Sequence, residues 1–252
     1  MIDIVGVTKT YGSVVVVDDV DLRIPAGGIT SIIGANGAGK STLISMVSRL
    51  LTAERGTITV DGHDVAATKS DELARRLAIL RQENHLAARL TVRDLVAFGR
   101  YPHSRGRLTT LDRAQIEQAI DYLDLDALTD RYLDELSGGQ RQRAFVAMVL
   151  CQNTDYVLLD EPLNNLDMSH AVEMMRILRR AADELGKTIV MVVHDINFAS
   201  TYSDHIVAMK DGRVLHQGPP ADVIEPGPLR EIFGIDVAVH VIDGHRIGVY
   251  YS

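Results

Sequence analysis

The sequence predicts an α/β fold in which a mostly parallel sheet is covered by helices and interrupted by a helical insert. Two short segments, residues 156–159 and 188–193, are almost uninterrupted runs of apolar side chains, and a helical pattern over residues 169–185 separates them. Apolar strands separated by helices are typical of parallel sheets that are buried on both faces. From about Asn84 to Leu150 the pattern is helical instead, which indicates the insert.

The N-terminal part is predicted to be β-structure. Apolar side chains alternate with Asp21 and Arg23 over residues 20–24, the period of a half-buried strand. Residues 26–28 form a turn, and the apolar residues 29–33 form a strand that runs into a glycine-rich loop and a helix. A further strand, residues 57–60, ends at a turn formed by Asp61 and Gly62.

Three helices are predicted in the insert. Thr91 begins the first, with Asp94 as its capping-box partner, and residues 112–123 form the second. Ser137 begins the third, with Gln140 at the capping-box position.

The C-terminal part returns to α/β and then to β-structure. Gly186 is a suitable stop for the helix over residues 169–185. The apolar positions of that helix recur at helical spacing, and they are Val172, Met175, Leu178, Ala182 and Leu185. Asp211-Gly212 and Asp243-Gly244 each separate two apolar runs, as hairpin turns do.

Composition excludes several classes of protein. The 252 residues carry a formal net charge of −8, which argues against a nucleic-acid binder. No apolar run reaches the roughly 18 residues that span a bilayer, and the N-terminus lacks the regions of a signal peptide, so we expect a cytoplasmic protein. The single cysteine, Cys151, excludes an internal disulfide and is expected to pack in the core.

Residues 34–41 carry the first chemical motif. They match the pattern G-x-x-x-x-G-K-[ST] in full, after a strand and before a helix, which is the context of a phosphate-binding loop. Glycines allow backbone N–H groups to approach a triphosphate, and the helix N-terminus adds positive potential. Lys40 is placed to bridge the β and γ phosphates, and Ser41 to ligate Mg²⁺.

Two acidic residues follow the apolar segment 156–159. Asp160 and Glu161 would lie at the carboxyl edge of the sheet, where ligands bind in open α/β folds. Asp160 is expected to hold Mg²⁺, and Glu161 to act as general base toward an attacking water. The alternative is an ordinary acidic loop after a buried strand.

His194 follows the segment 188–193 and should face the same edge. A histidine there could contact the γ-phosphate and hold the attacking water. A structural histidine is the alternative.

The segment 136–142, Leu-Ser-Gly-Gly-Gln-Arg-Gln, contains two glycines in the first turn of a predicted helix. Each glycine there costs up to about 1 kcal/mol relative to alanine, which suggests that something approaches the backbone closely. A phosphate at the helix N-terminus fits this requirement.

Together these motifs resemble those of the ABC transporter ATPase family, in family order and over essentially the whole chain. The resemblance implies a P-loop NTPase (RecA-like) core over residues 1–84 and 151–252 with an N-terminal antiparallel β subdomain, and a helical subdomain over residues 85–150. It also implies a head-to-tail dimer around two ATP molecules. Ser137, Gly138 and Gly139 in the signature segment 136–140 of one subunit would bind the γ-phosphate held by the phosphate-binding loop of the other.

Site residues follow from the resemblance. Tyr11 looks like the aromatic residue that stacks on adenine, although simple β packing is the alternative, and Gln82 looks like the residue that senses Mg²⁺ and the attacking water. The catalytic set implied is Glu161, His194, Gln82 and Lys40, and the metal set is Ser41, Gln82 and Asp160. The nucleotide-binding set is Tyr11, Gly34, Ala35, Asn36, Gly37, Ala38, Gly39, Lys40, Ser41, Thr42, Ser137, Gly138, Gly139, Gln140 and Asp167.

Two positions depart from the family pattern. Arg81 stands where proline often precedes the glutamine, and Leu163 stands where threonine often follows Glu-Pro. Neither change removes a group needed for hydrolysis. Segment 98–103 resembles the group of importers that serves iron–siderophore complexes, haem and cobalamin. Segments 82–86 and 161–167 look most like the siderophore branch of that group, including petrobactin-type systems.

The resemblance therefore implies an ATP- and Mg²⁺-dependent motor at the inner face of the cell membrane. Its partners would be transmembrane permease subunits, held through the helical subdomain, and indirectly an extracellular or periplasmic binding protein. Importers of haem or cobalamin, an exporter subunit, and a non-transport ATPase acting on nucleic acid or ribosomes are the alternatives. The single P-loop and the absence of a heptad run disfavour the last of these.

Overall fold

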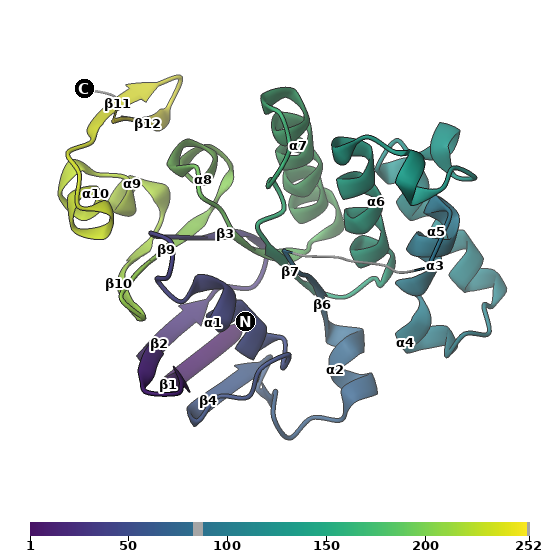
Figure 1. Cartoon of the computed structure of the whole chain (residues 1–252), viewed down its shortest axis with the longest axis horizontal. Coiled ribbons are helices and arrows are strands. Elements are labelled where there is room, and N and C mark those ends of the chain that lie inside the picture. Colours follow the sequence, from purple (N-terminus) through teal and green to yellow (C-terminus); the bar gives the residue numbers. More distant parts are fainter. Residues whose placement is uncertain (83–87, 251–252) are drawn as a thin grey trace.

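A central six-stranded sheet organises the molecule (Figure 1). The computed structural model describes residues 1–82 and 88–250. The strand order is β10-β9-β3-β8-β7-β6, and all neighbours are parallel except β9 and β10, so the mostly parallel sheet is confirmed. The strands are β3 (Gly28–Ile33), β6 (Leu77–Leu80), β7 (Tyr156–Asp160), β8 (Thr188–Val192), β9 (His205–Lys210) and β10 (Arg213–Gly218).

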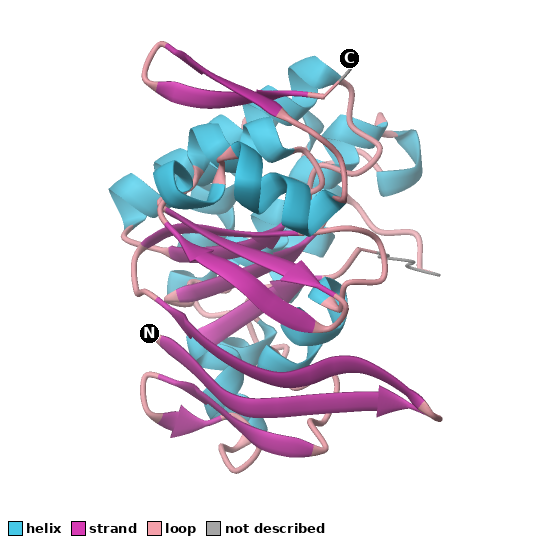
Figure 2. Ribbon diagram, turned by 90° about the vertical axis from the view of Figure 1, so that its left-hand side faces the viewer, coloured by secondary structure: helices cyan, strands magenta, loops and turns pink. Residues whose placement is uncertain are grey.

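An antiparallel sheet from the N-terminal part lies beside the central sheet (Figure 2). It has the order β2-β1-β4-β5, and helix α1 (Lys40–Val47) contacts β2 and β4 of this sheet and β7 of the central one. The strands are β1 (Ile2–Tyr11), β2 (Val14–Ile24), β4 (Arg55–Val60) and β5 (His63–Asp64). The half-buried alternation predicted near the start is confirmed within β2.

Strands β3, β6, β7, β8 and β9 divide their side chains between two cores. In β8, Ile189 and Met191 belong to the core shared with the helical region, whereas Val190 and Val192 belong to the core under α1 and the antiparallel sheet. This is the period-two alternation of a strand, with both faces apolar because both are covered. The apolar runs in the sequence are therefore explained by burial on two sides.

The helical region contains α3 (Val92–Phe98), α4 (Tyr101–Ser104), α5 (Thr110–Tyr122) and α6 (Gly138–Cys151), with short 3-10 turns at Asp126–Leu128 and Leu133–Glu135. The capping boxes predicted at Thr91 and Ser137 are both present. Helix α5 begins earlier than predicted, because Thr109 caps it and Asp112 is the capping-box partner. The predicted division at residues 84 and 85 lies outside the described residues.

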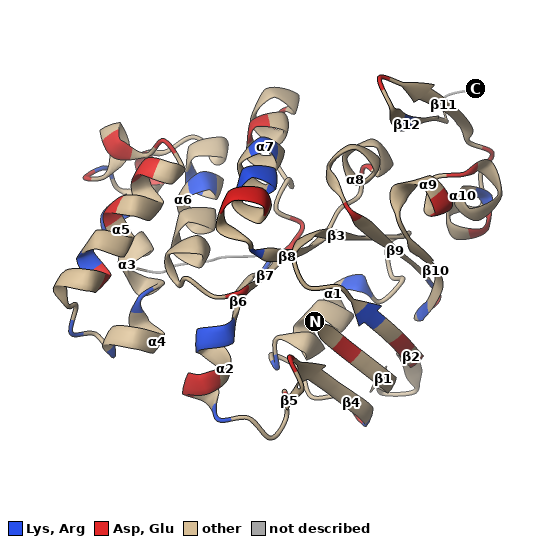
Figure 3. Cartoon of the chain, turned by 180° about the vertical axis from the view of Figure 1, so that it is seen from behind, with Lys and Arg blue, Asp and Glu red and all other residues tan. Residues whose placement is uncertain are grey.

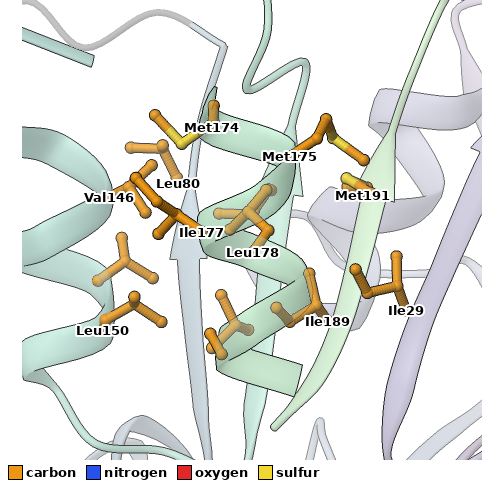
Figure 4. Close-up of a cluster of buried hydrophobic side chains, with 14 of the residues drawn as sticks. Ile29, Leu80, Val146, Leu150, Met174, Met175, Ile177, Leu178, Ile189 and Met191 are labelled. Carbon is orange, nitrogen blue, oxygen red and sulfur yellow. The ribbon is translucent and has the colours of Figure 1, made fainter. Parts of the chain in front are cut away.

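Helix α7 (Met168–Leu185) differs from prediction in its buried face. Val172 is only half-buried and Leu185 is 41% exposed. The helix lies between α6 and the central strands, so its apolar face is wide (Figure 4). The side chains that it buries are Ala171, Met174, Met175, Ile177, Leu178, Ala181 and Ala182. The predicted stop at Gly186 is confirmed by its left-handed φ of 61°.

Elements near the C-terminus were only partly predicted. Both hairpin turns are confirmed, but β10 is followed by α9 (Pro220–Val223) and α10 (Pro226–Phe233) before the last hairpin. Both helices begin with a proline, whose fixed φ is compatible with the first turn of a helix. In this part of the sequence, proline therefore indicated where a helix begins. The unpredicted α-helices among the described residues are α2 (Ser70–Arg76), α4, α8 (Ile196–Tyr202), α9 and α10. The last hairpin is β11 (Ala238–Ile242) with β12 (His245–Val249).

Acidic and basic side chains are interspersed on α5, α7 and the N-terminal sheet (Figure 3). Within residues 1–82 and 88–250, no helix combines the length and the hydropathy that a bilayer crossing requires.

Candidate active site

The glycine-rich loop between β3 and α1 has a backbone that side chains would disturb. Gly39 has φ of 94°, and a Cβ atom there would lie 2.5 Å from the carbonyl oxygen of Val16. A Cβ atom on Gly34 would lie 2.1 Å from the carbonyl oxygen of Met209. These glycines are therefore needed to seat the loop against β2 and β9.

The loop surrounds a hollow of about 340 Å³ beside the start of α1. No side chain caps the N-terminus of α1, whereas Ser137 caps α6 and Asp167 caps α7. The first-turn N–H groups of α1 are thus left for an anion, which fits a nucleotide phosphate. The residues around the hollow are Val16, Asn36, Gly37, Ala38, Gly39, Lys40, Ser41, Thr42, Gln82, Glu161 and His194.

Lys40 is a buried cation at this hollow. Its Nζ donates hydrogen bonds to the carbonyl oxygens of Gly34 and Ala35, each at 2.9 Å. Burial lowers the pKa of Lys40, while the nearby carboxylates of Glu161 and Asp160 act against that shift. A bound anionic phosphate would further favour the protonated, positively charged form of Lys40.

Ser41 and Asp160 form the next part of the site. The Ser41 hydroxyl donates to Asp160 Oδ1 at 2.8 Å, so a helix start and a strand end are joined here. Burial raises the pKa of Asp160, and the hydrogen bond from Ser41 opposes the rise. Two adjacent oxygen donors beside a phosphate-binding loop fit Mg²⁺, which prefers oxygen ligands.

Three polar side chains contact the carboxylate of Glu161. Gln82 Nε2 donates to its Oε2 at 2.7 Å, His194 Nε2 lies 2.7 Å from its Oε1, and Asn164 Nδ2 donates to Oε2 at 3.3 Å. Glu161 has φ of 53°, which is unusual for a residue with a Cβ atom and holds it in a tight turn after β7. The side chain is only 12% exposed, so its direction is well defined.

The contact from Asn164 to Glu161 was missed in the sequence. Asn164 follows Glu161 by three residues, which is the spacing between the first and last residues of a β-turn. Its backbone N–H donates to the Glu161 carbonyl oxygen at 3.1 Å. That spacing after a strand end was the available signal.

The signature segment lies apart from this group. Among the described residues around the hollow there is none from segment 136–140. The inference drawn from its two glycines needs correction for one of them. A Cβ atom on Gly139 would lie 2.7 Å from the ring of His170 in the same chain, so packing within the chain already requires that glycine. Gly138 is exposed, and its nearest neighbour would be 3.7 Å away.

Tyr11 lies at the end of β1 and is 49% exposed. It borders a second hollow together with Ser41, Thr42 and Asp160, next to the first. The ring is therefore not packed as a core residue, and stacking on adenine stays a prediction. Residues 83–86 of the segment that follows Gln82, which suggested the siderophore type, lie outside the described residues.

Comparison with known proteins agrees with this arrangement. A sequence model described as ABC transporter matches residues 17–164. The petrobactin import ATP-binding protein YclP of Bacillus subtilis is 54% identical over the full length of both chains. The petrobactin import ATP-binding protein FatE of Bacillus anthracis is 56% identical over 97% of each chain.

Solved structures give the same class. The dimeric ATP-binding cassette MJ0796, in a post-hydrolysis state bound to ADP and Pi, has a TM-score of 0.78 and 29% identity, and the match covers 87% of this chain and 99% of that one. A metal-chelate type ABC transporter in an inward-facing conformation has a TM-score of 0.84 over 99% of this chain and 98% of that one, but at 22% identity it shows the fold alone.

The fold and the loop around Lys40 define a P-loop nucleotide hydrolase. The chain belongs to the ABC transporter family and is an ATP-binding, ATP-hydrolysing member of it.

Proposed function

We propose that this chain is the motor subunit of an importer for iron–siderophore complexes. ATP binding draws two subunits together, and hydrolysis at Glu161 lets them separate. The observation that carries this proposal is the group of Gln82, His194 and Glu161 at the hollow around Lys40.

The direction of the Glu161 carboxylate supports a role as general base. Gln82 contacts one of its oxygens and His194 contacts the other, so the carboxylate is oriented at the rim of the phosphate-binding hollow. A general base acts on water that lies within hydrogen-bond reach of both it and the phosphate. Gln82 would orient that water with Glu161, and His194 would hold both the base and the terminal phosphate.

Mg²⁺ would be held by Ser41 and Asp160, with Gln82 nearby. The ion would neutralise charge on the phosphates. Ser41 lies at the first turn of α1 and Asp160 at the end of β7, so binding of the ion would join these two elements through a second link besides their hydrogen bond.

A dimer follows from the separation of the two phosphate-binding features. Ser137, Gly138 and Gln140 do not border the chain's own hollow, so we infer that they meet the nucleotide of a second copy. The similarity to a dimeric cassette supports this arrangement. Each ATP would then touch two subunits, and its preference for the closed form sets how far it can shift the equilibrium.

The substrate class rests on the relatives. Both Bacillus proteins that match over nearly their full length carry names of petrobactin import. The chain itself would contact permease subunits through its helical region and lie at the inner face of the membrane. The transported compound would bind to those other subunits.

Glu161→Gln tests the assigned base. We expect ATP binding to persist, hydrolysis to fall by at least about 100-fold, and a stable dimer to form with ATP, because a general base contributes about 10²–10⁴ in rate. ATPase assays, nucleotide titration and light scattering measure these effects. Glu184→Gln, far along α7 and exposed, is the matched control. Rapid turnover by Glu161→Gln would overturn the assignment.

Reconstitution tests the substrate class. The chain would be placed with its permease and binding protein in liposomes, and ATPase activity measured with ferric petrobactin, another ferric siderophore, haem and cobalamin. Stimulation by a ferric siderophore is expected. Stimulation by haem or cobalamin alone would assign the chain to that other importer type.

A further inference from the structure

His170 lies between Gly139 of the signature segment and Asp167, and the family resemblance assigns both of these residues to nucleotide binding. Its ring stands against Gly139 of the signature segment, with Cδ2 at 2.7 Å and Cγ at 2.9 Å from where a Cβ atom would be. Carbon atoms of two separate side chains do not approach within 3.0 Å in close-packed proteins. The His170 ring therefore occupies the space that a side chain on Gly139 would need.

The same ring is held on its other side by Asp167. His170 Nδ1 lies 2.8 Å from Asp167 Oδ1, and the His170 backbone N–H donates to that oxygen at 2.9 Å. Hydrogen bonds from the His170 backbone and ring lower the pKa of Asp167, so this carboxylate stays charged over the range in which proteins work. The ring is therefore fixed in direction.

Further contacts join helix α6 to the loop after Glu161 and to helix α7. Gln142 Nε2 donates to the carbonyl oxygen of Pro162 at 2.9 Å, and Arg143 pairs with Glu173 at 3.3 Å. Helix α6 is thus attached to the loop after Glu161 through Gln142 and to α7 through Arg143.

We propose that His170 is a positioning residue that fixes the signature segment against Asp167 within one subunit, so that both meet the neighbouring subunit as one surface. This inference rests on the proposed closed dimer. The ring lies outside the chain's own hollow, so it acts on assembly and not on binding of ATP to the isolated subunit.

The test is a set of suppressor pairs. Gly139→Ala should reduce ATPase activity by about tenfold or more, because its methyl group displaces the ring. Adding His170→Ala removes the obstacle, and activity should return to within about threefold of His170→Ala alone. Gly138→Ala is the matched control. It meets no such neighbour, so His170→Ala should not rescue it.

A second readout separates positioning from general stability. In the Glu161→Gln background, His170→Ala should raise the ATP concentration needed for dimerisation, with unchanged affinity of the monomer for a fluorescent ATP analogue and an unchanged melting temperature. His170→Asn, which can still donate to Asp167, should restore dimerisation in part.

Failure of either proposal is recognisable. A wild-type chain that neither hydrolyses ATP nor dimerises would refute the proposed function. A normal wild-type chain in which Gly139→Ala is harmless, or is not rescued by His170→Ala, would overturn the role of His170. The role of His170 would also be overturned if His170→Ala weakened ATP binding by the monomer as much as it weakened dimerisation.

Discussion

Asp112 and Asp94 occupy the same capping-box position on two helices, yet their surroundings differ. Each accepts hydrogen bonds from the backbone and hydroxyl of the threonine that caps its helix. Asp94 is exposed, whereas Asp112 is buried and pairs with the equally buried Arg100 at 2.9 Å. Hydrogen bonds from Thr109, together with Arg100, lower the pKa of Asp112 to about 2 despite its burial.

Removing these carboxylates should therefore have unequal effects. Asp112→Ala leaves the Arg100 charge buried without its carboxylate and should cost about 3–5 kcal/mol of unfolding free energy. Asp94→Ala loses exposed hydrogen bonds and should cost about 1 kcal/mol. Urea unfolding at pH 7 measures both. Equal losses would show that the buried pair adds nothing to the capping box.

The pH dependence of the same residue has a definite sign. The folded-state pKa of Asp112 is lowered, so its stabilisation is complete well above the unfolded value of about 3.9 and is lost as pH falls through 2, by about 2–3 kcal/mol in total. The gap in unfolding free energy between wild type and Asp112→Ala should narrow between pH 4 and pH 2. A gap that stays constant over this range would contradict the lowered pKa.

The sequence revealed the residues whose motifs have fixed spacing, and it missed those that come together through the fold. Lys40, Asp160, Glu161 and His194 could be assigned to one edge because they follow strand ends. The ring of His170 against Gly139 could not be foreseen, because it depends on how α7 is set beside α6. No local pattern encodes that distance.

At the scale of elements, buried strands and capped helices were predictable, and short elements were not. Apolar runs made β3, β7 and β8 visible, and Thr91 and Ser137 marked helix starts. Helices α8, α9 and α10 have seven, four and eight residues, too short to display a helical period. Leu185 was misassigned because periodicity alone cannot show where a helix passes beyond the core.

The C-terminal hairpin is attached to the helix that follows His194. Asn197 on α8 donates to the Gly248 carbonyl oxygen at 3.3 Å and accepts from the Gly248 N–H at 2.8 Å. A Cβ atom on Gly248 would lie 2.6 Å from Ile196 Cδ1. The hairpin therefore contacts the first turn of α8 directly, and Ile196 in that turn is two residues from His194.

Gly248→Val should push the hairpin away from α8. We expect a loss of about 1–3 kcal/mol in unfolding free energy from overpacking, together with faster proteolysis of the hairpin and a lower kcat as His194 shifts. Val241→Thr, on the same hairpin but 67% exposed, is the control and should change none of these. Wild-type kcat in Gly248→Val would show that the hairpin does not influence His194.

At the scale of the whole molecule, none of the described residues of the signature segment borders the hollow around Lys40 in the same chain. A chain with a defective phosphate-binding loop would still offer an intact signature segment, and the reverse holds for a chain with a defective signature segment. In a twofold dimer, residues of one patch meet residues of the other patch on the second copy. Two different defects can therefore complement each other.

Mixing Lys40→Ala with Ser137→Arg should recover ATPase activity that neither variant has alone. Random pairing makes half of the dimers mixed, each with one complete site, so recovery of at most about a quarter of wild-type activity is expected. ATPase assays over a range of mixing ratios measure this. If the mixture shows no gain over the separate variants, each nucleotide is handled by one chain only.

Cys151 is the single thiol in the chain, and it lies at the end of α6 with only 1% of its surface exposed. Burial raises its pKa to about 12, so the reactive thiolate is scarce at neutral pH. A cysteine introduced on the surface could therefore carry a spin label or a fluorophore without mutating the native one. Distances between two such probes would then follow the opening and closing of the motor in an otherwise unaltered protein.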